Sequence, residues 1–536
     1  MTTERKSVMK EKKLKFRLSG LLLALILAVA MLPISVIAAG NNGTISVSNI
    51  EAGAVVKAYQ IVKQDANGDW ETVIANSIVD PKAPTAAEIT ALAKNVSNLG
   101  AGTTLSEGTT ATTADGVTFK TYSKSNMSAG MYLVLVEKAN NVYVYNPVIV
   151  SVNYDYEGDE PELKGGTVDA DSNFTVGNSS AYAKRSKPTL NKEITGKTAN
   201  SKVNGDSTKV GDTLAVGDTV SFKIETTIPA YSGQYDNDNL KFEISDTVST
   251  GLNAPTNIVV KEADTVLIEN THYTLVKSNN NKTFTIKFKK EYLLSGFAKN
   301  IKVTYDSELN QNASSGFDAN TNTAGIVYSN SPSTTDNKEA ETYHYTFDID
   351  GNVFGQMTGR EIVKVGKDET TGELITKETN TQTTKPLPGA EFQLLDKDKN
   401  VLKTTTSTTA GLLTFRGLDA GEYYLKETKA PEGYSTDSTL VPVVISAVLN
   451  ADGTLASYTV TINGTNSTTY TWNNSGQTPT VDKTGDTSLF NNYKPGLLPS
   501  TGGNGIYFYI IAGIILIAMA TAVYVIIRKK DARRAG

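Results

Sequence analysis

The sequence predicts an all-β protein, with several β-sandwich domains in series between an N-terminal export signal and a C-terminal membrane helix. Short segments of alternating apolar and polar residues recur between turn signals, and Thr, Asn, Ser, Gly, Val and Tyr are plentiful. About 460 residues remain between the terminal signals, which suggests three domains by the usual domain size. Representative strand candidates are Thr44–Val47, Tyr132–Val136, Val142–Val152, Val220–Ile224, Phe284–Phe288 and Tyr458–Ile462.

The N-terminus has the pattern of a secretory signal peptide. Seven basic residues within the first 17 positions precede the apolar run Leu21–Leu32, which ends at Pro33. The small residues Ala38 and Ala39 follow, as at a signal-peptidase site. We therefore expect residues 1–39 to be removed and the rest to be exported.

Composition narrows the function classes. Residues 40–501 hold 39 basic and 53 acidic residues, a net charge of −14, which argues against a nucleic-acid partner. The chain has no cysteine. An exported protein without disulfides must gain its resistance to unfolding and to proteases from packing, from a metal or from another kind of cross-link.

Domain boundaries are expected where the composition becomes polar. One such stretch is Tyr154–Ser180 and another is Ser329–Thr342. The only good helical candidate is Thr85–Val96, whose apolar residues recur at helical spacing. The predicted divisions are a signal peptide at 1–39, domains at 40–183, 184–344 and 345–496, and a C-terminal segment at 497–536.

Three strand candidates of the second domain each place a polar residue on the apolar face. These residues are Lys192, Asp246 and Asn330, and residues of one parity in a half-buried strand face the core. The apolar neighbours that fix the parity are Leu190 and Ile194, Phe242 and Ile244, and Ile326 and Tyr328.

The third domain repeats the pattern. Glu427 shares parity with Tyr423 and Leu425, and Asn491 shares parity with Leu489. Lys364 shares parity with Ile362, but Val363 and Val365 on the other face leave that assignment open.

A lysine, an acid and an asparagine buried together suit an amide exchange. Burial lowers the pKa of a lysine and raises that of a carboxyl group, so the amine can attack while the acid supports the oxyanion. Ammonia leaves, and a lysine–asparagine isopeptide bond remains. The alternative is a surface lysine, a turn acid and a loop asparagine at each place.

The third domain resembles the CnaB-type domains of Gram-positive pilins. The segment Tyr424–Tyr434 (YLKETKAPEGY) is similar to the pilin E-box, while Leu387–Leu394 and Gly411–Leu418 are similar to the second and third strands of these domains. Lys364–Asp368 then occupies the first strand. The resemblance implies a bond from Lys364 to Asn491 with Glu427 as catalyst, and Lys367 and Asn492 are the alternatives shifted in register.

The second domain resembles the CnaA-like isopeptide-forming domain of the same proteins. The segments that carry this resemblance are Pro188–Ile194, Asp246–Leu252 and Tyr328–Pro332. This implies a bond from Lys192 to Asn330 catalysed by Asp246. The first domain resembles the N-terminal pilin domain, for example at Gly130–Val134, and no complete lysine, acid and asparagine set is predicted there.

The C-terminus resembles an LPxTG cell-wall sorting signal. An apolar run, Ile506–Ile527, is long enough to span a bilayer and is followed by a basic tail that stays in the cytoplasm. The alternative is a plain membrane anchor. The resemblance implies that a sortase cleaves between Thr501 and Gly502, within the recognition motif Leu498, Pro499, Ser500, Thr501 and Gly502.

Lys184 stands where backbone pilins have the lysine of their pilin motif. Ala183 replaces the proline of that motif, so the match is imperfect. By resemblance, Lys184 attacks the acyl-enzyme formed by Thr501 of another subunit. Lys187 is the next candidate, and an ordinary solvated linker lysine is the alternative.

The whole chain resembles a SpaA-type major pilin with three tandem immunoglobulin-like domains. The implied function is the adhesion-supporting backbone of a covalent pilus on the cell wall. The implied partners are a class C pilin sortase, a housekeeping sortase, identical subunits, minor pilins, peptidoglycan and host surface ligands. A monomeric wall-anchored adhesin or a tip pilin is the alternative.

An enzymatic function is disfavoured, since the chain has two histidines, no cysteine and no common hydrolase motif. No cofactor is expected. Asp348 with Asp350, or Asp169 with Asp171, could contribute to a calcium site, but solvated loops are favoured and no metal site is predicted.

Overall fold

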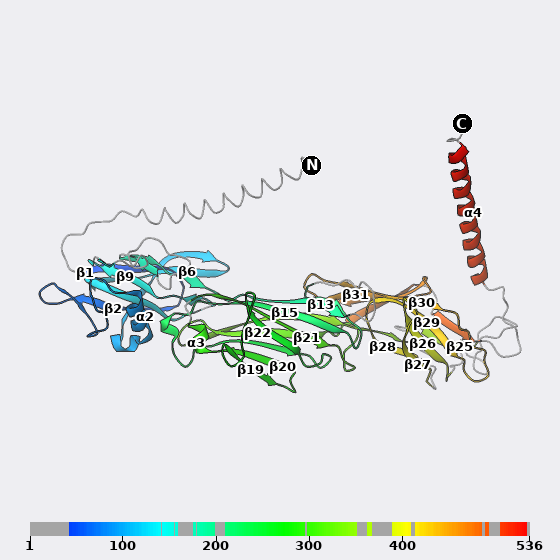
Figure 1. Ribbon diagram of the computed structural model, residues 1–536, viewed down its shortest axis with the longest axis horizontal. Helices are drawn as coiled ribbons and strands as arrows, with labels where there is room; N and C mark the ends of the chain where they lie inside the picture. The colour runs from blue at the N-terminus through cyan, green and yellow to red at the C-terminus, as the bar shows by residue number, and fades with distance from the viewer. Residues whose placement is uncertain are drawn as a thin grey trace.

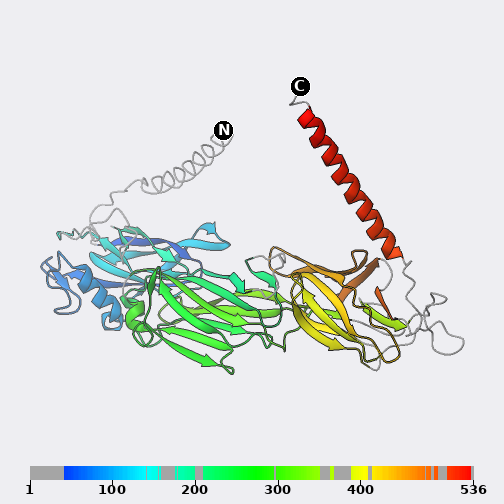
Figure 2. The ribbon, with the colours of Figure 1, turned by 45° about the vertical axis from the view of Figure 1, so that its right-hand side comes forward.

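The computed structural model describes residues 42–140, 142–154, 156–158, 175–177, 179–198, 209–294, 297–350, 362–366, 388–408, 413–476, 478–484, 488–492 and 504–532. Three groups of β-sheets lie in a row, so the protein is elongated (Figure 1). The turned view shows the same sequence of blue, green and yellow-orange groups (Figure 2). The predicted all-β class is confirmed.

The N-terminal group consists of two sheets that enclose an apolar core. The helix α2 (Ala86–Lys94) packs its buried Ile89 and Leu92 against the second sheet. Thr85 caps this helix in a capping box with Glu88, so the predicted helix forms where its N-terminal signal stands. One sheet has the order β11 (Ser180–Tyr182), β1 (Asn42–Glu51), β6 (Val117–Ser128) and β5 (Ser106–Ala114). The other has β10 (Thr175–Gly177), β9 (Val148–Val152), β7 (Gly130–Lys138), β2 (Val55–Gln64) and β3 (Trp70–Thr72), and β4 (Thr103–Thr104) also pairs with β2. The 3₁₀ turn η1 (Val96–Leu99) follows α2.

The middle group is a sandwich of two sheets. Alternation is clearest along β15, where every second side chain is buried from Val220 to Ile228. The first sheet has the order β13 (Leu190–Thr198), β15 (Thr219–Ile228), β21 (Lys299–Glu308), β17 (Thr256–Glu262) and β18 (Thr265–Val266). The second has β14 (Gly211–Thr213), β23 (Thr335–Tyr345), β22 (Asn320–Ser329), β16 (Phe242–Val248), β20 (Thr283–Phe288) and β19 (Tyr273–Ser278). The short helices η3 (Gly233–Tyr235) and α3 (Lys290–Leu293) lie in its connections.

The third group is built on one large sheet and two short strand pairs. Strand β25 (Ile362–Gly366) pairs in parallel with β34 (Ser488–Asn492). This pairing brings an early strand of the third group beside its last strand. The other pair is β24 (Phe347–Asp350) with β28 (Thr414–Leu418). The large sheet has the order β27 (Val401–Thr406), β26 (Glu391–Asp396), β29 (Gly421–Lys429), β30 (Val441–Leu449), β31 (Leu455–Ile462), β32 (Asn466–Asn473) and β33 (Thr478–Thr484).

Polar contacts connect the N-terminal and middle groups. Strand β12 (Arg185–Ser186) pairs with β8 (Val144–Tyr145), so the N-terminal pairings extend to Ser186. From the middle group, Gln234 donates a hydrogen bond to the Tyr145 carbonyl at 2.6 Å, and the Tyr328 hydroxyl donates to the Val142 carbonyl at 2.8 Å. These contacts join the end of the N-terminal group to the middle group.

The C-terminal helix α4 (Asn504–Ala532) contains a candidate membrane span, Ile510–Lys529. Its apolar side chains are exposed along this length, as a membrane-spanning helix requires. The predicted span, Ile506–Ile527, overlaps it. The sorting motif, residues 498–502, and the signal peptide lie outside the described residues.

Candidate functional site

Lys192 and Asp246 meet in the core of the middle sandwich. Lys192 lies on β13 and Asp246 on β16, so they come from the two facing sheets. The Lys192 ammonium position and an Asp246 carboxylate oxygen form a short ion pair, and both side chains are 0% exposed. The predicted inward orientation of both residues is therefore correct.

The surroundings favour the uncharged forms of this pair. The Lys192 Nζ lies 5.2 Å from the centre of the Phe222 ring. Burial lowers the pKa of Lys192, and burial raises the pKa of Asp246. Both shifts favour moving the proton from the lysine to the aspartate, which leaves a nucleophilic amine beside a carboxylic acid.

The asparagine at this site is Asn322, not the predicted Asn330. Asn322 is completely buried, and its Nδ2 donates a hydrogen bond at 3.0 Å to the hydroxyl of Tyr305. The Lys192 Nζ donates to the same hydroxyl at 2.7 Å. Tyr305 therefore touches both the amine and the amide.

Asn330 is too far along the sheet to react with Lys192. On β22 the residue paired with Asp246 is Ala324. Asn330 lies six residues beyond Ala324, roughly 20 Å along an extended strand. Its Oδ1 accepts a hydrogen bond from Thr334 at 2.6 Å. Asn322 has the same parity as Asn330, so a parity argument could have found it but could not have chosen between the two.

The third group contains a second acid–amide pair. Glu427 on β29 is buried, and its Oε2 accepts a hydrogen bond at 2.6 Å from the Nδ2 of Asn492 on β34. The same carboxylate oxygen accepts from the Asp437 amide at 3.0 Å. Asn492 is completely buried and also donates to the Ser435 carbonyl at 2.6 Å.

The asparagine in contact with Glu427 is Asn492, which the sequence offered as the register-shifted alternative to Asn491. Asn492 is the residue of β34 whose described side chain reaches Glu427. Parity alone could not decide between the two asparagines, because both Leu489 and Phe490 are apolar. In the parallel pair, Lys364 lies opposite Phe490, two positions before Gly366, which is opposite Asn492.

That register places Lys364 on the strand that adjoins Asn492. The side chains of Lys364 and Asn491, and all of Lys367, lie outside the described part of the chain.

The two linker lysines differ in their surroundings. The Lys184 side chain is half-buried, and its carbonyl accepts a hydrogen bond from the Asn146 amide at 3.2 Å. The Lys187 Nζ forms an ion pair with Asp115 at 2.7 Å, and this contact raises the pKa of Lys187. The Lys187 amine is therefore engaged by a carboxylate of the N-terminal group.

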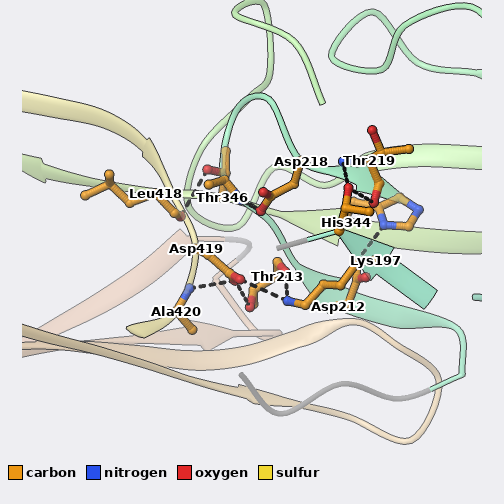
Figure 3. Close-up of polar contacts among 12 residues, drawn as sticks. Lys197, Asp212, Thr213, Asp218, Thr219, His344, Thr346, Leu418, Asp419 and Ala420 are labelled. Atoms are coloured by element: carbon orange, nitrogen blue, oxygen red, sulfur yellow. Dashed lines mark hydrogen bonds and ion pairs between the residues drawn. The ribbon is translucent and has the colours of Figure 1, made fainter. Parts of the chain in front are cut away.

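A buried polar cluster joins the middle and third groups (Figure 3). The Lys197 Nζ lies 2.9 Å from Asp419 Oδ2 and donates to the Thr213 carbonyl at 2.6 Å. The Thr213 hydroxyl donates to the other Asp419 oxygen. Nearby, the Thr346 hydroxyl donates to the Leu418 carbonyl at 3.1 Å. This joint connects segments more than 200 residues apart.

Asp348, at the same joint, accepts hydrogen bonds from two separate segments of the chain. Its Oδ1 accepts a hydrogen bond from the Gly417 amide at 2.9 Å, and its Oδ2 accepts from Ser315 at 3.0 Å. These contacts give the carboxylate a structural role. Asp169 and Asp171 lie outside the described residues.

Three family models match separate parts of the chain. The T6 antigen Ig-like domain matches residues 40–210, and the SpaA prealbumin-like fold domain matches residues 372–463. The LPXTG cell wall anchor motif matches residues 491–532, which include the five residues of the predicted sorting motif. These matches follow the order of the folded groups and the C-terminal helix.

Whole-chain comparisons agree with this order. The chain is 25% identical over 568 residues to the trypsin-resistant surface T6 protein of Streptococcus pyogenes serotype M6, covering 96% of this chain and 100% of that one. The solved T6 backbone pilin of serotype M6 Streptococcus pyogenes is similar in fold, with a TM-score of 0.53 and 20% identity. That match covers 86% of this chain and 100% of the other, whose structure is described as modular and three-domain.

The fold and the anchor together define a cell-wall-anchored surface protein of Gram-positive type. Within that class the chain is similar to backbone pilins, because it has a SpaA prealbumin-like domain, an LPXTG anchor and the fold of the T6 backbone pilin. The expectation drawn from the E-box and the sorting signal is thereby confirmed.

Proposed function

We propose that this backbone pilin cross-links itself through two isopeptide bonds, Lys192–Asn322 in the middle domain and Lys364–Asn492 in the third. The contacts among Lys192, Asp246, Tyr305 and Asn322 are the observation that carries this proposal. They place a buried amine, a buried acid and a buried amide together in a dry core.

The reaction follows from these positions. The neutral Nζ of Lys192 attacks the Cγ of Asn322, while protonated Asp246 donates a hydrogen bond to the amide oxygen as negative charge develops on it. The bond from Cγ to Nδ2 then breaks, and ammonia leaves. Among the described residues, Asp246 Oδ1 and Asn322 Oδ1 are buried and have no hydrogen-bond partner, so neither oxygen is engaged elsewhere before the reaction.

Glu427 has the same role in the third domain. Its contact with Asn492 Nδ2 places the acid directly at the amide that would react. The parallel pairing of β25 with β34 brings Lys364 to the same end of the sheet as Asn492. Each bond would tie an early strand of a domain to a late one, so that tension along the fibre would be carried by covalent bonds.

Subunits would be joined from Thr501 of one copy to Lys184 of the next by a class C pilin sortase, and a housekeeping sortase would attach the last copy to peptidoglycan. The ion pair of Lys187 with Asp115 favours Lys184 as the acceptor. Lys184 lies between β11 and β12, at the end of the N-terminal group that precedes the middle group.

A polymerisation assay tests the acceptor. Residues 40–503 are incubated with a class C pilin sortase, and covalent multimers are separated on a denaturing gel. The wild-type and Lys187→Ala chains should form a ladder of multimers, and the Lys184→Ala chain should not. A full ladder from Lys184→Ala would show that another lysine is the acceptor.

A further inference from the structure

Tyr305 touches both nitrogens of the reaction proposed for the middle domain. Its hydroxyl is 2.7 Å from Lys192 Nζ and 3.0 Å from Asn322 Nδ2. The first nitrogen must lose a proton as it attacks, and the second must gain a proton to leave as ammonia. We propose that the Tyr305 hydroxyl is a catalytic proton shuttle that carries a proton from the attacking lysine to the departing amide nitrogen.

One of the two existing hydrogen bonds already has the direction that this transfer needs. Both nitrogens donate to the tyrosine oxygen, so a Lys192 proton already points at it, while the bond to Asn322 Nδ2 must reverse during the reaction. When Lys192 bonds to Cγ, Asn322 Nδ2 loses its amide conjugation and becomes a basic amine. The oxygen can then take the lysine proton and give its own to Nδ2.

The balance of the step is complete without any further reactant. The new bond joins Lys192 Nζ to Asn322 Cγ, the bond from Cγ to Nδ2 breaks, and one ammonia leaves. Tyr305 and Asp246 end in the protonation states in which they began. The two residues have different roles. Asp246 donates a hydrogen bond to the amide oxygen, and Tyr305 delivers a proton to the amide nitrogen.

The ring of Tyr305 is held firmly in place. It stacks on Phe222 with the ring centres 5.1 Å apart, and it meets Phe284 edge to face at 5.1 Å. Its side chain is buried on β21. Burial and the neighbouring Asp246 raise the pKa of Tyr305 well above its usual range, so the phenol keeps its proton and transfers one only as it receives another.

The proposal rests on the isopeptide bond of the proposed function, and its test separates the two. The chain from residue 40 to 497 is made in a brief pulse of cell-free synthesis and quenched in acid at set times. Mass spectrometry then follows the linked Lys192–Asn322 peptide against the unlinked ones. If the wild-type chain never forms the linked peptide, the proposed function fails.

Tyr305→Phe keeps the ring contacts and removes only the hydroxyl. We expect it to slow formation of the Lys192–Asn322 bond by about 100-fold or more, the usual contribution of a positioned proton-transfer group. Tyr231→Phe is the matched control, since Tyr231 is equally buried and its hydroxyl donates instead to the Ser329 carbonyl at 3.0 Å. That variant should link at the wild-type rate.

Two further readouts exclude a merely structural role. The Lys364–Asn492 bond in the same molecules should form at its normal rate, and resistance of the middle domain to protease should show that it has folded. If Tyr305→Phe fails to fold, 3,5-difluorotyrosine at position 305 keeps the shape and makes the phenol more acidic. The rate of linking should then change, together with its pH dependence. A wild-type rate in Tyr305→Phe, or a wild-type pH profile with the fluorinated residue, would overturn the proposal.

Discussion

Two lysines of strand β13, Lys192 and Lys197, each pair with an aspartate, but the two pairs differ in their exposure to water. Lys192 pairs with Asp246 inside the middle domain, where both side chains are 0% exposed. Lys197 pairs with Asp419 across the joint to the third domain, where the lysine is 20% exposed and the aspartate 0%. A β-bulge between Ile194 and Gly196 separates the two lysines on β13.

The difference shows what distinguishes a reactive pair from an ion pair. At the first site neither partner reaches water, and the asparagine amide shares a hydroxyl contact with the lysine. At the second site the lysine keeps part of its hydration and binds the Thr213 carbonyl, a stable peptide group. A charged lysine there stabilises Asp419 but cannot attack it. We therefore expect a covalent bond at the first site and an ordinary salt bridge at the joint.

The largest expected effect comes from removing the reactive amine. Lys192→Ala should abolish the loss of one ammonia and lower the free energy of unfolding of the middle domain by about 5 kcal/mol, because the cross-link closes a loop of roughly 130 residues. Intact mass and urea unfolding measure the two effects. Asn322→Ala should behave in the same way and Asn330→Ala should not. If Asn330→Ala lacked the bond and Asn322→Ala kept it, the Lys192–Asn330 bond predicted from the sequence would be correct.

The third domain offers a similar test on its own bond. Asn492→Ala should remove the cross-link there, and Asn491→Ala should leave it intact, since Asn492 is the residue that contacts Glu427. Intact mass distinguishes them, because each closed bond lowers the mass by about 17 Da. If Asn491→Ala is the variant that fails to lose the ammonia, the assignment of the bond to Asn492 is wrong.

At the joint the expected effect is smaller and depends on pH. Burial raises the pKa of Asp419 from 3.8 to about 6. The folded state therefore holds this proton more tightly than the unfolded state, and the contribution of Asp419 to stability rises as the pH falls from 7 towards 4. The change amounts to roughly 3 kcal/mol at most.

Asp419→Asn removes that titration and keeps the shape. Relative to wild type, its free energy of unfolding should be most favourable at pH 7, and this advantage should shrink towards pH 4. Urea unfolding at several pH values, with each variant compared at the same pH, gives the difference. A constant difference across this range would contradict the assigned burial of the carboxylate.

The smallest expected effect is that of the hydroxyl at the joint. Thr213→Val removes one hydrogen bond to Asp419 and should cost about 1 kcal/mol near pH 7. The cost should fall at low pH, where protonated Asp419 needs fewer donors. Thermal unfolding of the wild-type and variant chains at pH 7 and pH 4.5 measures it, and neither chain should change in mass.

The sequence could predict the residues whose position follows from alternation along one strand. Lys192, Asp246 and Glu427 were assigned inward by parity, and the structure places all three there. Parity could not choose between Asn322 and Asn330, because both lie on the same face of one strand or its end. The choice depends on how β22 is aligned with β16, which is a tertiary property.

Other features had no local signal. Tyr305 is an ordinary apolar-face residue of β21 by sequence, and only the folded core reveals its two nitrogen contacts. The Lys197–Asp419 pair joins residues 222 positions apart. By contrast, the helix at Ala86–Lys94 could be predicted because its cap and its apolar spacing are local.

The most direct measurement is peptide mapping of the wild-type chain from residue 40 to 497 by mass spectrometry. The account predicts a total deficit of about 34 Da, one ammonia for each of two bonds. It also predicts a branched peptide that joins Lys192 to Asn322 and another that joins Lys364 to Asn492. An unmodified mass, or a branch from Lys192 to any residue other than Asn322, would contradict it.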